Sequence, residues 1–424
     1  MIIKKLIVAS FLFTQLVSPL GAAPNPTTFN LAKEKISDLI SNANIIPSSI
    51  ELDDVKYNIE YTIDEELSNH IVKMLKRLKP NYSAVVVVDN DTGNILTALG
   101  YEKKNNLINY KLPFSSSHPA ASLAKVVTSA VLLEHNDIDL ETPMAFQGRS
   151  TTLRPKQLTD YVTVKKTKKG RKKIVRHNKY QNFLQAFASS NNPIFAKAAI
   201  KNLSGELLKD MADRMGFNQN IMEDLTMPVS EFRVARSPMI IAQYASGYNN
   251  LNTISPIHAA IIPTIIVNNG YLKNPRIIKR IFSTDEDELD LPEGNETQVL
   301  QNDVALDLKQ MMEATITIGT GKRGFSTMNP ALFEQLEIGG KSGTFSGGFP
   351  YGKREWFIAF AKPKDSSQGN GISIAVMNIN SKKKVRSSRM VREIVEYYFQ
   401  DLHEGETQES KEEIDDGSDD EIDV

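Results

Sequence analysis

The chain has 424 residues, of which 41% are hydrophobic and 24% charged, enough for one large domain or two ordinary ones with a substantial core. It contains no cysteine, which excludes disulfides, thiolate metal sites and a cysteine nucleophile. The net charge of -1 combines nine Lys or Arg in residues 165–179 with eleven Asp or Glu in residues 404–424, so total charge gives no argument for a nucleic-acid partner.

The first 23 residues have the features of an export signal. Lys4 and Lys5 precede an apolar run that ends in small residues suited to cleavage before Pro24. The alternative is an uncleaved anchor, because the run approaches the roughly 18 residues that span a bilayer. We therefore expect the protein in the periplasm or at the extracytoplasmic face of the cell envelope. Residues 24–55 are polar with three prolines, and we expect a linker with one short helix.

Hydrophobic periodicity predicts the first elements of the folded domain, which we expect to span residues 56–402. Residues 63–78 place apolar side chains at the spacing of an amphipathic helix. Residues 84–100 combine two β-rich runs with a polar turn, which predicts a hairpin. The continuous valines of the first run indicate a strand buried on both faces.

Helical patterns dominate the middle of the chain, and strands return near its end. A helix is expected to begin at Pro119, since proline suits a first helical turn. Further helices are predicted over residues 181–201, 205–215, 255–268 and 303–318, strands over 337–344, 355–361 and 372–379, and a last helix near 386–401. This order indicates an α+β fold in which helices pack against a sheet. Residues 403–424 are acidic and poor in large apolar groups, which predicts a disordered tail.

The first of three short motifs places Lys125 three residues after Ser122. A serine hydroxyl needs a base within hydrogen-bond reach to act as a nucleophile, and residues i and i+3 share one face of a helix. Small apolar neighbours would desolvate the lysine and lower its pKa, as a base requires. Taken alone, the pattern is more often a surface lysine on an amphipathic helix.

The second motif is the run of two serines and two asparagines at residues 189–192. A hydroxyl and a carboxamide two residues apart in a loop can relay a proton and hold an amide substrate. The alternative is helix capping, for which Ser and Asn are preferred residues.

The third motif, residues 337–345, is a predicted strand in which glycines flank Lys341 and Ser342. Glycine in a strand often marks the close approach of a ligand or another chain. The alternative is a strand that merely bends at its glycines.

In their order of nucleophile, loop and strand, the three motifs resemble the transpeptidase domain of penicillin-binding proteins, within the penicillin-recognising serine acyltransferases. The similarity covers roughly residues 56–400 and includes "GTGKRG" before the third motif and "REWFIAFAK" after it. It implies a five-stranded antiparallel sheet flanked by helices, plus an all-helical subdomain. One departure is Ala121, where that family usually has glycine before the nucleophile.

The resemblance also implies the catalytic roles. Ser122 would be the nucleophile, Lys125 its base, and Lys341 a source of positive potential in the cleft. The second motif would be Ser189 with Asn191, and the register of Ser190 with Asn192 is the alternative.

The substrate would be bound by the strand of the third motif, through Ser342, Gly343 and Thr344. Ser342 would bind the terminal carboxylate, and the backbone N–H groups of Ser122 and Thr344 would form the oxyanion hole.

We therefore predict a peptidoglycan D,D-transpeptidase or D,D-carboxypeptidase that acts on D-Ala-D-Ala stem peptides through a Ser122 acyl-enzyme and is inhibited covalently by β-lactams. No cofactor or metal is expected, since the six histidines form no His-x-x-x-His pair. The alternatives are a serine β-lactamase and a non-catalytic envelope scaffold that keeps the fold. The motifs do not specify whether an amine or water accepts the acyl group.

The basic insert, residues 162–179, has valines flanking a charged centre, which predicts a protruding hairpin between the first and second motifs. Its charge favours an anionic partner: a wall polymer, lipid headgroups or the acidic tail. The alternative is a solvated hairpin with no partner. No nucleic-acid partner is expected.

Overall fold

The computed structural model describes residues 26–135, 138–159, 162–166, 172–176, 178–380 and 385–402. The predicted export signal (1–23) and the predicted disordered tail (403–424) lie outside these residues. Within the described parts of the chain, no helix combines the length and the apolar character needed to cross a bilayer.

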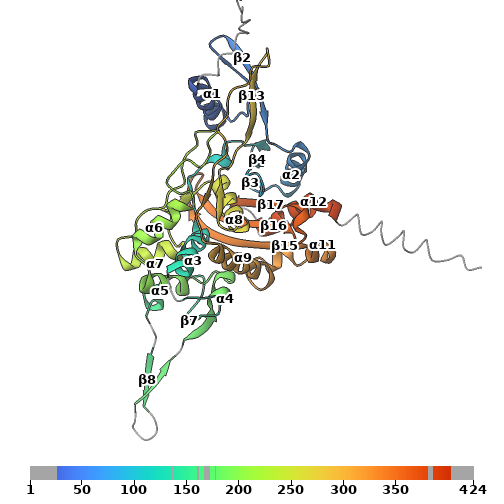
Figure 1. Ribbon diagram of the computed structural model, residues 1–424. Helices are drawn as coiled ribbons and strands as arrows, with labels where there is room; N and C mark the ends of the chain where they lie inside the picture. Colours follow the sequence, from blue (N-terminus) through green and yellow to red (C-terminus); the bar gives the residue numbers. More distant parts are fainter. Residues whose placement is uncertain are drawn as a thin grey trace, which may run out of the picture.

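A six-stranded antiparallel sheet forms the centre of the molecule (Figure 1). Its strand order is β15-β16-β17-β3-β4-β5, which places strands from the two ends of the domain side by side. The strands are β3 (Tyr82–Asp89), β4 (Ile95–Glu102), β5 (Leu107–Ile108), β15 (Leu336–Gly347), β16 (Gly352–Pro363) and β17 (Ile372–Ile379). The α+β class and the hairpin at 84–100 are confirmed, and the two-residue β5 adds one strand to the expected five.

Helices cover both faces of this sheet. In β3, Val86 and Val88 belong to one hydrophobic cluster, and Val85 and Val87 to the other, because successive side chains of a strand point to opposite faces. The first cluster includes α8 (Pro256–Val267) and most of α9 (Asn302–Thr317), and the second includes α2 (Glu65–Leu78) and α12 (Ser387–Tyr398). The prediction that the valine run is buried on both faces is confirmed.

A helical region beside the sheet carries the first two motifs. Its central helix is α3 (Ala124–His135), whose residues 124–132 are all buried. The surrounding helices are α4 (Phe183–Ala188), α5 (Asn192–Asn202), α6 (Gly205–Arg214) and α7 (Pro238–Ser246). Two short helices, α10 (Lys322–Phe325) and α11 (Pro330–Gln335), lead from α9 into β15.

Two predicted helix boundaries are wrong, for local backbone reasons. The helix expected from Pro119 begins at Ala124, because β6 (His118–Pro119) pairs with β11 (Thr253–Ile254) and the 3₁₀ turn η3 (Ala121–Leu123) follows. The single helix expected over 181–201 is divided into α4 and α5, because Ser190 has a φ of 56°, which an α-helix cannot contain.

Much of the segment expected to be a linker, residues 24–55, is folded in the structure. It contains α1 (Pro26–Asp38), a π-helical turn (Leu39–Ala43) and β1 (Ser49–Leu52). β1 pairs with β2 (Val55–Tyr61), which also pairs with β13 (Ile278–Ser283) from far along the chain. The one short helix expected in this segment is present as α1. The description of the rest as a linker is wrong, because the segment packs through Ala32, Ile36 and Ile40, which are fully buried, and through β1.

Three further strand pairs lie outside the main sheet. They are β7 (Pro143–Phe146) with β10 (Lys179–Asn182), β8 (Val162–Lys166) with β9 (Lys172–Arg176), and β12 (Tyr271–Lys273) with β14 (Glu296–Gln298). β8 and β9 are antiparallel, as the hairpin prediction for the basic insert requires. Figure 1 shows this hairpin projecting from one end of an elongated molecule, with α1, β2 and β13 at the opposite end.

Candidate active site

Ser122 lies where the helical region meets the sheet. It is in η3, directly before α3, and β15 packs against this turn. The preceding residue, Ala121, has a φ of 50°, in the left-handed region that favours glycine. The turn is also crowded, because a Cβ atom at Gly247 would lie 1.8 Å from the carbonyl oxygen of Ala121. The position of Ser122 therefore depends on a strained residue and on a glycine at the end of α7.

Lys125 is fully buried and its amine has three oxygen partners. The Nζ atom lies 2.9 Å from Ser122 Oγ, 2.7 Å from Asn192 Oδ1 and 2.6 Å from the carbonyl oxygen of Ser246. Burial lowers the pKa of Lys125 well below its ordinary value, and the nearby charge of Lys341 lowers it further. The sequence prediction of a desolvated amine beside a serine hydroxyl is thus matched by the geometry.

The contacts of the second motif favour the alternative register. Asn192 Oδ1 accepts from Lys125, and Ser190 Oγ accepts a 3.0 Å hydrogen bond from Lys341 Nζ. These two side chains connect the lysines of the first and third motifs. The structure therefore brings Ser190 and Asn192, the less favoured pair, to the site.

Ser189 and Asn191, the preferred pair, contact Gln181 instead. Ser189 Oγ lies 3.2 Å from Gln181 Nε2, and Asn191 Nδ2 donates to Gln181 Oε1 at 2.8 Å. The Asn191 side chain also accepts from the backbone N–H of Ile194 and so caps α5. The capping interpretation is correct for Asn191, and the preferred register is wrong because this cap turns the side chain away from Lys125.

Lys341 of β15 is the second fully buried lysine. Besides Ser190, its Nζ atom contacts the carbonyl oxygen of Ser342 at 3.1 Å and lies 5.2 Å from the centre of the Phe187 ring. Burial lowers the pKa of Lys341 to about 7. Two buried amines thus lie on either side of the second motif, each held by a serine or asparagine side chain.

The strand of the third motif offers a hydroxyl and a free backbone edge. Ser342 Oγ shares a 2.6 Å hydrogen bond with Thr320 Oγ1, and Thr344 is exposed. A Cβ atom at Gly343 would be only 3.4 Å from the Cβ of Ala121, so this strand passes close to the serine turn. Among the described strands β15 pairs only with β16, which leaves its other edge available to an extended peptide.

Thr320 is a site residue that the sequence analysis missed. It lies in the turn after α9, where its backbone N–H donates to the carbonyl of Ala188 at 3.0 Å. That bond joins the turn to the end of α4, next to the second motif. The resemblance of "GTGKRG" to a family turn was the one signal that could have identified it.

Arg354 and Trp356 of β16 fix the approach to the serine. Both lie in the stretch "REWFIAFAK", which carries part of the family resemblance but gave no role to either residue. The buried Arg354 guanidinium donates to the carbonyl of Gly352 at 3.0 Å and to that of Pro350 at 2.7 Å, which holds the turn beyond β15. It also donates to His118 Nδ1 at 3.2 Å, and the indole N–H of Trp356 donates to the carbonyl of Pro119 at 3.1 Å. These bonds attach the segment leading to Ser122 to the main sheet.

Comparisons with known proteins concern the domain as a whole. Residues 83–396 match the family described as the penicillin binding protein transpeptidase domain. A solved structure of PBPA from Mycobacterium tuberculosis has a TM-score of 0.62 and 18% identity, over 81% of this chain and 82% of that chain. At these identities the solved structures show a shared fold.

Two further structures have similar values. For penicillin-binding protein 3 from M. tuberculosis, complexed with aztreonam, the TM-score is 0.64 at 16% identity, over 85% of this chain and 84% of that chain. For the D,D-transpeptidase domain of a peptidoglycan glycosyltransferase from Eggerthella lenta, the TM-score is 0.61 at 16% identity, over 82% of this chain and 84% of that chain. No curated protein matches the sequence.

Proposed function

Because the chain belongs to the penicillin-binding protein transpeptidase family, we propose that it is a serine D,D-transpeptidase or D,D-carboxypeptidase that forms an acyl-enzyme at Ser122. The observation that carries this proposal is the buried Lys125 amine, 2.9 Å from Ser122 Oγ. Its substrate would be the D-Ala-D-Ala end of a peptidoglycan stem peptide, and its location the extracytoplasmic side of the envelope.

The other two partners of Lys125 prepare it to act as a base. A neutral amine has two hydrogens and one lone pair. Asn192 Oδ1 and the carbonyl of Ser246 are both acceptors, so they take the two hydrogens. The lone pair then faces Ser122 Oγ, and it receives the hydroxyl proton as Oγ attacks the carbonyl carbon of the penultimate D-alanine.

The remaining motif residues support the later part of the step. As the peptide bond breaks, the departing amine of the terminal D-alanine needs a proton, and the Ser190 hydroxyl, which accepts from Lys341, would relay one. Ser342, with Thr320 beside it, would bind the substrate carboxylate. The N–H groups of Ser122 and Thr344 would stabilise the oxyanion, and losing one such donor typically costs about 3 kcal/mol.

β-Lactams would acylate the same serine. Solved structures of M. tuberculosis penicillin-binding protein A are described as acyl-enzyme complexes with imipenem and ceftriaxone. Labelling the protein with a fluorescent penicillin, followed by intact-mass measurement, tests the proposal: we expect one adduct on the wild type and none on Ser122→Ala. A wild-type chain that remains unlabelled would overturn the acyl-enzyme.

The fate of the acyl group separates the related activities. Release of D-alanine from a stem pentapeptide, with and without an added amine acceptor, distinguishes carboxypeptidase from transpeptidase. Rapid turnover of a chromogenic cephalosporin would identify a β-lactamase instead. Binding of the stem peptide without any acylation would identify a non-catalytic scaffold.

A further inference from the structure

Three phenylalanine rings pack together next to the two buried lysines. Phe183 and Phe187 lie one helical turn apart in α4, and Phe195 lies near the start of α5. All three side chains are completely buried. The ring centres of Phe187 and Phe195 are 6.4 Å apart, and those of Phe183 and Phe195 are 5.6 Å apart. The turn between α4 and α5 therefore brings rings from both helices into one cluster.

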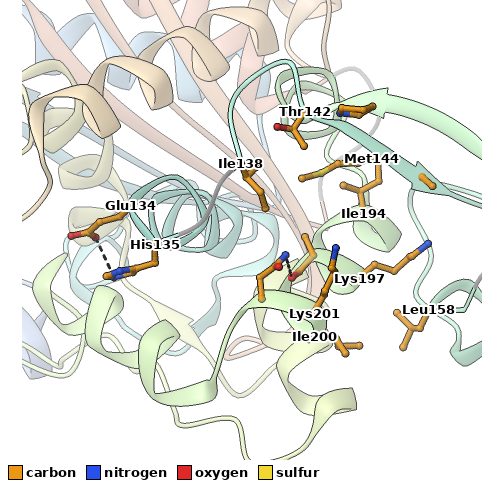
Figure 2. Close-up of a pocket in the computed structure, with 14 residues that line it drawn as sticks. Glu134, His135, Ile138, Thr142, Met144, Leu158, Ile194, Lys197, Ile200 and Lys201 are labelled. Atoms are coloured by element: carbon orange, nitrogen blue, oxygen red, sulfur yellow. Dashed lines mark hydrogen bonds and ion pairs between the residues drawn. The ribbon is translucent and has the colours of Figure 1, made fainter.

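Phe195 belongs to a different face of α5 from the residues drawn in Figure 2. That view shows Ile194, Lys197 and Lys201 of this helix beside a pocket, which also borders the end of α3 and β7. Phe195 is not among the described residues that line the pocket. Its ring faces Lys125 instead, whose Nζ atom lies 5.5 Å from the ring centre. α5 thus contributes a ring to the surroundings of the Lys125 amine.

Lys341 has the same relation to Phe187. Its Nζ atom lies 5.2 Å from the centre of that ring, and its other contacts, Ser190 Oγ and the carbonyl oxygen of Ser342, are neutral. An ammonium within about 6 Å of a ring centre is attracted to the negative face of the ring. Among the described residues no cation lies over the ring of Phe183. Each lysine therefore has one ring, and the third ring of the cluster has no lysine.

The rings matter because no anion nearby balances a positive charge. The charged group that faces Lys125 is Lys341, and no carboxylate of the described residues acts on either amine. The hydrogen-bond partners of Lys125 are the neutral oxygens of Ser122, Asn192 and Ser246. Burial opposes protonation of both lysines. Beyond these hydrogen bonds, the aromatic face is the contact that favours the charged form.

We propose that each ring stabilises the ammonium form of the lysine beside it, and that the two rings together set the pH range of acylation. This inference rests on the acyl-enzyme proposed at Ser122. Lys125 becomes an ammonium when it takes the hydroxyl proton, so the Phe195 ring favours the transition state over the neutral starting amine. The Phe187 ring keeps Lys341 charged to higher pH. Both phenylalanines are positioning residues, because they act through the lysines.

Leucine substitutions test the two rings separately. The pKa of each lysine is followed by NMR of isotopically labelled lysine side chains, with Lys125→Met and Lys341→Met for assignment. Each leucine variant should lower the pKa of its own lysine by about one unit, as loss of a desolvated cation–π contact predicts. In the pH profile of penicillin acylation, Phe195→Leu should move the rising limb to lower pH, and Phe187→Leu the falling limb. Phe195→Leu should also slow the maximal rate, by up to about tenfold.

Two further variants separate charge stabilisation from packing. Phe183→Leu removes a buried ring of the same cluster, so it should lose stability in urea like the other leucine variants but move neither limb. A ring-fluorinated phenylalanine in place of Phe195 keeps the ring but weakens its negative face, so it should move the rising limb as Phe195→Leu does. Equal limb shifts in Phe183→Leu would overturn the proposal, as would an unchanged pKa of Lys125 beside the fluorinated ring.

The lysine titrations also keep this inference distinct from the proposed function. They are measured on the free protein and need no acylation. A wild type that penicillin does not label, but whose lysines titrate as expected in the variants, would overturn the acyl-enzyme and leave the role of the rings standing. Labelling of Ser122 with lysine pKa values that do not respond to either ring would overturn the role of the rings alone.

Discussion

The molecule places lysines in two contrasting environments. Lys125 and Lys341 are completely buried, and each amine is held by oxygen atoms of neighbouring residues. Lys201, in the last turn of α5, is exposed to solvent. Burial penalises the charged form of an amine, whereas water stabilises it. The same side chain can thus be a buried amine held by oxygen atoms in one region and a solvent-exposed group in the other.

Replacing Lys125 by Met should produce the largest effect. The variant keeps an unbranched side chain of similar length but has no base for Ser122, and loss of a general base typically costs 10²–10⁴-fold. We expect acylation by fluorescent penicillin to slow about 10³-fold. Lys103→Met, on an exposed turn, serves as the control for a lysine in solvent. Comparable acylation rates in the two variants would contradict the contrast between buried and exposed amines.

The register of the second motif can be tested by a pair of adjacent variants. Asn192→Ala removes an acceptor that orients Lys125, and misplaced catalytic groups can cost about 10²-fold in rate. Asn191→Ala removes the N-cap of α5, which should cost about 1 kcal/mol of stability. Asn192→Ala should therefore show the larger loss of acylation rate, and Asn191→Ala the larger loss of unfolding free energy. Both quantities are measured on both variants. A larger rate loss for Asn191→Ala would restore the rejected register.

Gly247→Ala should damage the serine turn without touching a motif residue. The new Cβ would overlap the carbonyl of Ala121, and Gly247 has a φ of 67°, which alanine rarely adopts. We expect a loss of about 2–4 kcal/mol in unfolding free energy, from overpacking and backbone strain combined. Acylation should slow as well, since Ser122 follows Ala121.

Gly294→Ala is the control for that substitution. Apart from Gly294 itself and its two chain neighbours, no described residue has a heavy atom within 4 Å of a Cβ built there. Its unfolding free energy should change by less than about 0.5 kcal/mol. If the two glycine variants lose similar stability, the contact between α7 and the serine turn does not position Ser122.

The pH dependence of acylation should reveal both buried lysines. For the free enzyme, kcat/KM should rise as Lys125 loses its proton, and fall above about pH 7 as Lys341 loses its charge. Lys341→Arg keeps a positive charge at this position and should shift the falling limb to higher pH. A falling limb that stays near pH 7 in this variant would show that another group is responsible.

The same pKa shift has a consequence for stability. The pKa of Lys341 falls from 10.5 to about 7 on folding, so between these values the unfolded chain binds more protons than the folded one. The contribution of Lys341 to the unfolding free energy should therefore rise with pH over that interval. Urea unfolding of the wild type and of Lys341→Met, repeated at several pH values, gives the unfolding free energy of each protein as a function of pH. The difference between the two curves is the contribution of Lys341.

The three motifs, taken together with the family they resemble, were sufficient for part of this site. The spacing of Ser122 and Lys125, and the Lys-Ser-Gly sequence at 341–343, identified residues that the structure brings together. The register at 189–192 was ambiguous, because both pairs fit the same spacing. They are distinguished by three-dimensional contacts: Asn192 and Ser190 accept from the two buried lysines, whereas Asn191 caps α5.

Other parts of the site had no local signal. Ser246 contributes a backbone carbonyl and Gly247 contributes the absence of a side chain, and neither contribution depends on a recognisable motif. Likewise, β2 pairs with β13 across more than two hundred residues, so no short window could predict that sheet. These contributions depend on how distant segments are placed relative to one another, which a short stretch of sequence does not specify.

The smallest expected effect concerns Ala121, where the family usually has glycine. Because Ala121 has a φ of 50°, Ala121→Gly should remove strain and raise the unfolding free energy by up to about 1 kcal/mol. The gain is limited, because the Ala121 side chain is buried and its Cβ lies close to Gly343. Chemical denaturation measures the difference, and Ala120→Gly, at a neighbouring residue with a φ of -63°, should instead be destabilising. If both variants lose stability equally, the turn before Ser122 is not strained, and the family's glycine needs a different explanation.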